Sequence, residues 1–291
     1  MNQWNKLRWG KEIYLALLSA GPLAYFLYHT ERDIPLFSRL YGRLDVQVSD
    51  HLLELVESEL DLMKDVKKFK MKVSLTDRLD GRVFGSSFFK SGAELQLPLR
   101  LIFHEADDAK KVGSILDIDA GIKKAAIAFD ISSEQGELLL SRMQLSDEAR
   151  RFVVRRELFS AQSGKRFIFP ILLWCIGFGF GYGVLVALVP VIGILASFAV
   201  AASVGFLIFF KLHSIFSVLI TYALDRKACI GSDTGLNGAV EYFTSSMKLC
   251  RAMRKLIGEK AFESITETGD CISHPVLYSE RLAAIMESAN K

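Results

Sequence analysis

The residues whose types and spacing suggest chemistry lie on two predicted helices. Glu157 directly follows Arg156 and stands three positions before Ser160, and Asp225 lies four positions after Thr221. A glutamate between two histidines one helical turn apart activates water on a zinc ion, and a carboxylate on a second helix is a typical third ligand. Here arginine, serine and threonine occupy the ligand positions, so only the general-base position matches. An arginine would put a fixed positive charge where the metal ion should sit.

The same residues have simpler structural roles, which we favour. A general base without a metal ion has no activated water to deprotonate, so Glu157 is expected to pair with Arg155, Arg156 or a later arginine. Asp225 is expected to pair with the helical turn that carries Arg156 and Glu157. His274 and the proline after it are expected to form a turn before the last helix, with the lining of a peptide groove as the alternative.

Histidine and cysteine offer no substitute metal site. No two of the five histidines are three or four positions apart, and the four cysteines include no C-x-x-C pair. The sequence therefore predicts neither a zinc ribbon nor a disulfide framework, and we assign no catalytic, cofactor-binding or metal-binding residue. The residues concerned are His29, His51, His104, His213 and His274, and Cys175, Cys229, Cys250 and Cys271.

The composition indicates a membrane segment flanked by ordinary soluble ones. Hydrophobic residues make up 51% of the chain and the mean hydropathy is +0.26, yet 24% of the residues are charged. The net charge of +3 is too small to indicate nucleic acid as a partner, and no basic run with interleaved aromatic residues occurs.

A long uncharged stretch separates the two helices with the candidate residues. The 44 residues 167–210 carry no charge, whereas one bilayer crossing needs about 20 apolar residues. Pro190 lacks the N–H that would continue a helix, so we predict a membrane hairpin whose loop lies around it, at residues 186–193. Two buried helices of a soluble core are the alternative, but such helices rarely run this far without a charge. Four glycines lie in the first half of this stretch, and they either let the two helices of the hairpin pack closely or form a face that binds a partner. They are Gly177, Gly179, Gly181 and Gly183.

The N-terminus predicts a further membrane contact. Lys6, Arg8 and Lys11 precede residues 13–28, which are uncharged and mostly apolar. A basic start before an apolar run fits a signal peptide, an anchor or a mitochondrial entry signal. No clear cleavage site follows, so we expect residues 1–30 to be a basic segment and an apolar anchor. The 16 residues 13–28 fit either a full span or a helix lying partly in the interface.

Residues 44–165 predict an α+β soluble segment. Ser49 suits an N-cap, and Leu52, Val56 and Leu60 follow it at helical spacing. Residues 69–75 and 93–97 alternate apolar and polar side chains as strands do, with a turn signal at 80–81 and a stop at Pro98 that favours a position at or near a sheet edge. Residues 126–131 and 138–145 are weaker strand candidates.

Helices flank the hairpin on both sides. Ser146 predicts an N-cap, with acidic residues after it suited to the positive end of a helix that feeds the hairpin. After the hairpin, helices are predicted over 214–229, 236–253 and behind His274. Residues 211–291 are therefore expected to form a C-terminal helical segment that packs with residues 44–165.

The order of these parts resembles the membrane-embedded HExxH zinc peptidases. In that family the helix before the hairpin carries H-E-x-x-H, the helix after it carries E-x-x-x-D, and a late His-Pro…Arg segment closes the site. Arg156, Ser160 and Thr221 stand at the three ligand positions, so the resemblance implies an inactivated scaffold, a pseudo-peptidase. The predicted fold class is α+β and mostly helical, with a two-helix membrane hairpin and a small antiparallel sheet on this scaffold.

A closer resemblance is to the transmembrane protein 177 family, over about residues 70–285. The resemblance rests on an L-S-x-E-A-x-x-F segment with R-E, an L-D-R segment, a V-E-[FY] segment and the late His-Pro region. The N-terminal anchor is similar in kind only, and family members can keep a glutamate where this chain has Thr221. The matching residues are Leu145, Ser146, Glu148, Ala149, Phe152, Arg156, Glu157, Leu224, Asp225, Arg226, Val240, Glu241 and Tyr242.

The resemblance implies a multi-pass protein of the mitochondrial inner membrane that acts in cytochrome c oxidase assembly. Its expected partners are newly made oxidase subunit II, the membrane chaperone of that subunit and the lipid bilayer, and its expected role is non-enzymatic and cofactor-free. Two alternatives stay open: a membrane-bound zinc peptidase with an unusual metal site, and a membrane scaffold outside mitochondria.

Overall fold

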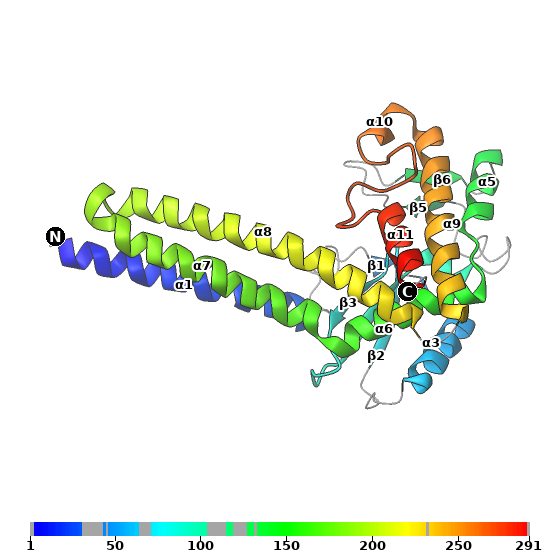
Figure 1. Ribbon diagram of the computed structural model, residues 1–291, viewed down its shortest axis with the longest axis horizontal. Helices are drawn as coiled ribbons and strands as arrows, with labels where there is room; N and C mark the ends of the chain where they lie inside the picture. Colours follow the sequence, from blue (N-terminus) through cyan, green and yellow to red (C-terminus); the bar gives the residue numbers. More distant parts are fainter. Residues whose placement is uncertain are drawn as a thin grey trace. The chain divides into compact units, whose positions relative to one another are not determined.

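Figure 1 shows the computed structural model, which divides into two compact units. We call Met1–Phe37 with Lys165–Leu219 the hairpin unit, and Ser38–Gly164 with Ile220–Lys291 the folded domain. The structure describes residues 3–30, 43–44, 46–63, 71–103, 115–118, 127–130, 133–230 and 233–289.

Three long helices form the hairpin unit. They are α1 (Gln3–Thr30), α7 (Lys165–Ile192) and the first part of α8 (Ile194–Cys229), and Figure 1 shows α1 alongside α7. Within the described part of the chain, α7 and α8 are the two helices long and apolar enough to cross a membrane. The helix predicted at 214–229 is the continuation of α8, which runs through Lys211 without a break.

The turn of the hairpin lies at Gly193, inside the predicted loop at 186–193 but three residues after Pro190. Helix α7 includes Pro190 and ends at Ile192. Gly193 has a φ of +79°, a left-handed conformation that glycine adopts readily, and its N–H bonds to Val189 O at 3.2 Å. A proline in the last turn removes one hydrogen bond but does not end a helix whose neighbouring bonds are intact.

Aromatic side chains fill the interior of the hairpin unit. Tyr14 is fully buried and donates its hydroxyl to Ala201 O at 3.4 Å, and Trp174 donates Nε1–H to Leu18 O at 3.1 Å. The Trp174 ring stacks on Phe178 with centroids 4.2 Å apart. These contacts tie α1 to α7 and α8, so the N-terminal anchor packs on the hairpin.

The folded domain contains a mixed sheet, and the expected antiparallel sheet is wrong. Its strands are β1 (Arg43–Leu44), β2 (Met71–Thr76), β3 (Arg82–Gly85) and β4 (Ala93–Pro98), in the order β1-β2-β4-β3. Strand β4 lies parallel to β2 and antiparallel to β3, so Pro98 ends a central strand and not an edge strand. All six β4 residues are buried, as expected for a strand that has a neighbour on each side.

A second correction concerns residues 138–145, which belong mostly to helix α5 (Glu134–Met143) and not to a strand. Ser133 caps this helix by accepting a hydrogen bond from Gly136 N at 3.0 Å, and Leu139, Leu140 and Met143 are buried at helical spacing. The neighbouring candidate at 126–131 is strand β6 (Ile127–Asp130), which pairs antiparallel with β5 (Ile115–Ile118).

The remaining helices pack around the sheet in one hydrophobic core. Helix α6 packs against α3, α9 and the edges of β3 and β4, and α9 also contacts α5 and α11. The expected amphipathic helix at 49–63 is confirmed as α3. The bounds are α3 (Asp50–Leu62), η1 (Leu99–Ile102), α6 (Asp147–Ser163), α9 (Asp233–Ile257), α10 (Glu259–Phe262) and α11 (Tyr278–Ala289).

Candidate functional site

Helix α6 positions Arg156 and Glu157, and local sequence sets where this helix begins and ends. Ser146 Oγ accepts a hydrogen bond from Ala149 N at 3.2 Å, and Gly164 ends the helix with a left-handed φ of +58°. Both candidate side chains are buried inside the folded domain.

A buried ion network joins α6, α8 and α11. Arg156 Nε lies 3.1 Å from Asp225 Oδ1. Arg281 donates to both oxygens of the same carboxylate, from Nε at 2.6 Å and from Nη2 at 2.8 Å. This two-pronged geometry is the strongest one available to an arginine and a carboxylate. None of the three residues is more than 3% exposed, so Asp225 is the shared anion of two buried cations.

Asp80 is the second carboxylate of the network. The turn after β2 places its Oδ2 2.9 Å from Arg281 Nη1 and its Oδ1 3.6 Å from Arg156 Nη1. Tyr242, on α9, donates its hydroxyl to Asp80 Oδ1 at 2.6 Å. Helices α6, α8, α9 and α11 and the β2–β3 turn therefore all meet at this network.

The charges of the network set its protonation. Burial alone would raise the pKa of Asp80, but the guanidinium groups of Arg281 and Arg156 hold that pKa well below its usual range. Burial lowers the pKa of His274, whose Nδ1 lies 3.8 Å from Asp80 Oδ2. At neutral pH the Asp80 carboxylate is ionised and the His274 imidazole is neutral.

The network closes on itself and does not fit a zinc ion. Arg156 stands at the first ligand position, and a guanidinium has no lone pair to offer a metal. Its Nη1 lies 3.5 Å from Glu157 Oε1, so the general-base position faces a fixed cation. Across the described residues, no three His, Cys, Asp or Glu side chains converge as metal ligands do. The arrangement locks helices together, and we derive no hydrolytic step from it.

The structure tests the pairings expected at this site. The Arg156–Asp225 pair is confirmed, and Glu157 lies beside Arg156 as expected. Arg155 instead donates Nε–H to Glu59 of α3, at 2.8 Å. The sequence predicts a turn at Asp80 and no more, because no local pattern shows that a turn residue faces buried arginines.

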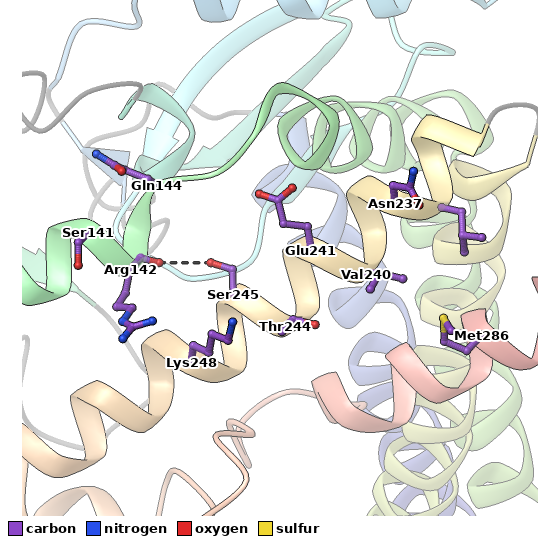
Figure 2. Close-up of a pocket in the computed structure, with 11 residues that line it drawn as sticks. Ser141, Arg142, Gln144, Asn237, Val240, Glu241, Thr244, Ser245, Lys248 and Met286 are labelled. Atoms are coloured by element: carbon purple, nitrogen blue, oxygen red, sulfur yellow. Dashed lines mark hydrogen bonds between the residues drawn. The ribbon is translucent and has the colours of Figure 1, made fainter.

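The sequence does not reveal a groove elsewhere in the folded domain, since one wall of it is helix α5, whose residues 138–143 were predicted as part of a strand. It has a volume of about 580 Å³ and lies among α5, α9 and α11, as Figure 2 shows. Ser245 on α9 donates its hydroxyl to Arg142 O on α5 at 3.3 Å across it. The lining residues are Ser141, Arg142, Gln144, Leu236, Asn237, Val240, Glu241, Thr244, Ser245, Lys248 and Met286.

A pair of cysteines also meets without a sequence signal. Cys250 and Cys271 are both buried, and their sulfurs lie 3.3 Å apart. They are free thiols that stand 21 positions apart in the sequence, a spacing that indicates no particular site.

The fold and the site together define a class of protein: a mostly helical membrane protein with two candidate spans, whose folded domain is closed by a buried ion network. The chain belongs to the transmembrane protein 177 family, whose model matches residues 6–286. The match includes the N-terminal helix, where we had expected similarity in kind only. No curated protein and no solved structure gives a match.

Proposed function

We propose that this protein is a non-enzymatic assembly or stabilising factor that acts in the maturation of cytochrome c oxidase subunit II in the mitochondrial inner membrane. Membership of the transmembrane protein 177 family supports the membrane setting. The client and the compartment follow from the family resemblance, and the partners are subunit II and its membrane chaperone.

The observation that carries the non-enzymatic role is the closed ion network. Arg156 fills the first ligand position and forms an ion pair with Asp225 on α8, with 3.1 Å between Nε and Oδ1. Every carboxylate that a hydrolytic site would use there lies against a guanidinium group. Breaking a buried ion pair is unfavourable by about 3–5 kcal/mol, so these groups are held in structural contacts.

The hairpin offers a surface for a client's membrane helix. Gly177 and Gly181 face inward, but a Cβ added at Gly179 or Gly183 would meet nothing within 4 Å. Small residues four positions apart let a second membrane helix approach closely. Phe180, between them, is 67% exposed and would pack on such a helix. In this mechanism the outer face of α7 holds the client while the folded domain holds a second partner.

Purification of tagged protein from mitochondria in mild detergent tests the proposal. We expect subunit II or its chaperone in the eluate, and recovery of neither would refute the proposed client. Gly179→Leu/Gly183→Leu should reduce the recovery severalfold, because leucine fills the outer face. Ala199→Leu is the matched control, since Ala199 is also exposed on the hairpin unit but lies on α8.

Two further measurements address the alternatives. Fractionation of a tagged copy decides between mitochondria and another membrane. Metal analysis of the purified protein addresses the zinc peptidase: stoichiometric zinc that is lost in Glu157→Gln would favour that enzyme over an assembly factor.

A further inference from the structure

The groove among α5, α9 and α11 carries positive charge that no carboxylate of the described residues pairs with (Figure 2). We propose that this groove binds a short acidic segment of a partner protein, with carboxylates at one end of the segment and apolar side chains at the other. The inference deepens the proposed function, because it assigns the second partner of the folded domain a site and a chemistry.

A buried cation, Arg100, lies behind the groove. Arg100, in η1, is 1% exposed, and no carboxylate of the described residues lies within ion-pair distance of it. Its guanidinium donates to Ser246 Oγ at 2.8 Å and to Ser245 Oγ at 3.0 Å, and it lies over the Tyr242 ring. Its Nε makes no hydrogen bond. Buried arginines are ordinarily paired, so this charge is unusual.

Ser245 connects this buried charge to the groove. The Ser245 oxygen accepts a hydrogen bond from Arg100, so the hydroxyl proton of Ser245 is free to point toward the groove. That proton now goes to Arg142 O over 3.3 Å, a long and weak hydrogen bond. A carboxylate in the groove would receive the proton after a rotation of the hydroxyl, in a stronger bond because the acceptor is charged.

The lining of the groove adds two more cations. Arg142 and Lys248 are exposed, project from facing helices in Figure 2, and have no carboxylate partner within the described chain. The acidic lining residue, Glu241, turns away from them, since both of its oxygens accept hydrogen bonds from Ser146, the N-cap of α6. The groove and the layer behind it therefore hold an excess of positive charge.

The other end of the groove is apolar. Leu236, Val240 and Met286 line it, on α9 and α11. From Leu236 to Lys248 the axis of α9 rises about 18 Å, which matches an extended segment of about five or six residues. A groove with cations at one end and apolar side chains at the other favours a peptide over a small anion, which would use only the cationic end.

The test measures binding of a peptide probe to the full chain in detergent. The probe is EDELLL with blocked ends and an uncharged dye, followed by fluorescence anisotropy at low salt. Wild-type protein should bind it, and Arg142→Glu/Lys248→Glu should bind it about tenfold more weakly or worse. Both substitutions are on the surface, so folding should be unaffected, as circular dichroism will check.

The matched control is Lys255→Glu/Lys260→Glu, which makes the same change in net charge at exposed residues outside the groove. It should keep at least half of the wild-type affinity. An equal loss in both double variants would overturn the groove as the site. Equal binding of the neutral probe QNQLLL would overturn the requirement for acid. Displacement by inorganic phosphate, beyond that by chloride at the same ionic strength, would indicate a small-anion site and overturn the peptide as occupant.

This outcome is separable from that of the proposed function. If the probe binds in the groove but purification recovers neither subunit II nor its chaperone, the acidic-segment site stands and the client is wrong. If the client is recovered equally by wild type and by Arg142→Glu/Lys248→Glu, and the probe does not bind, the groove inference fails alone.

Discussion

Two buried arginine sites in the folded domain differ in how their charge is balanced. In the ion network, Arg156 and Arg281 share the carboxylates of Asp225 and Asp80. Behind the groove, Arg100 is as well buried, but among the described residues it contacts hydroxyl groups and an aromatic ring and pairs with no carboxylate. The network uses its charges to hold helices together, whereas the groove leaves its charge for something outside the domain. Burial of a charged side chain therefore marks a binding position only where the domain leaves that charge unbalanced.

The hairpin unit contains the same contrast in apolar form. Gly177 and Gly181 are used internally: a Cβ at Gly177 would lie 2.7 Å from Gly205 O, and one at Gly181 would lie 2.5 Å from Ala201 O. Gly179 and Gly183 meet nothing. One pair lets α7 and α8 approach each other, and the other pair leaves the helix open to a partner.

The largest effect should come from removing the shared anion. Asp225→Asn keeps the shape of the side chain but leaves Arg156 and Arg281 facing each other inside the domain. We expect the free energy of unfolding of the folded domain to fall by about 3–5 kcal/mol. A loss below about 1 kcal/mol would contradict the view that this network holds the helices together.

Thiol reactivity can follow the folded domain alone. Cys250 and Cys271 are buried there, and Cys175 is the exposed thiol of the hairpin unit. Cys229, in the folded domain, is a partly exposed thiol. On a Cys175→Ser/Cys229→Ser background, a thiol-reactive dye therefore reports mainly the opening of the folded domain as the temperature rises. Asp147→Asn is the control, because it removes a carboxylate of α6 that is 63% exposed.

The next effect concerns the two glycine pairs. Gly181→Ala places a methyl group against the Tyr14 hydroxyl and Ala201 O, so we expect a loss of stability of about 1–3 kcal/mol in the hairpin unit. Gly183→Ala should leave stability unchanged or raise it by up to about 1 kcal/mol, because both substitutions gain the same intrinsic helix propensity and a Cβ at Gly183 meets nothing within 4 Å. Melting followed by Trp174 fluorescence measures both, and equal shifts would show that the inner and outer faces are assigned wrongly.

Local signals predicted the hairpin and α6 well, since a missing charge and an N-cap serine act within a few residues. The order of the sheet was harder to predict, because β2 pairs in parallel with β4 although β3 lies between them in the sequence. The Arg156–Asp225 contact was expected from the order of the helices and the hairpin. Asp80 joins this contact from a turn, and the local sequence of that turn predicts only the turn and not its buried partners. The groove was missed for a related reason: its wall depends on α5, and three consecutive leucines at 138–140 fit a strand or a helix equally.

A smaller effect should follow pH. The pKa of His274 is lowered in the folded state by burial, so the folded domain binds fewer protons than the unfolded chain below the ordinary histidine pKa of about 6.5. Its stability should be full above that pH and decrease as the pH falls below it. Thiol-dye melting between about pH 7.5 and pH 5.5 measures this, and His274→Gln should flatten the profile. An unchanged slope in that variant would assign the dependence to another group.

A small change in stability should come from replacing Arg100, the arginine without a carboxylate partner among the described residues. This substitution compares the two arginine sites directly. Arg100→Met has a similar length and removes a buried charge that has no carboxylate partner to strand, so the free energy of unfolding should stay within about 1 kcal/mol of the wild-type value. Binding of the acidic probe should nevertheless weaken, because the charge behind Ser245 is gone. A stability loss as large as that of Asp225→Asn would mean that Arg100 has a structural role like that of Arg156, and the two sites would then not differ in kind.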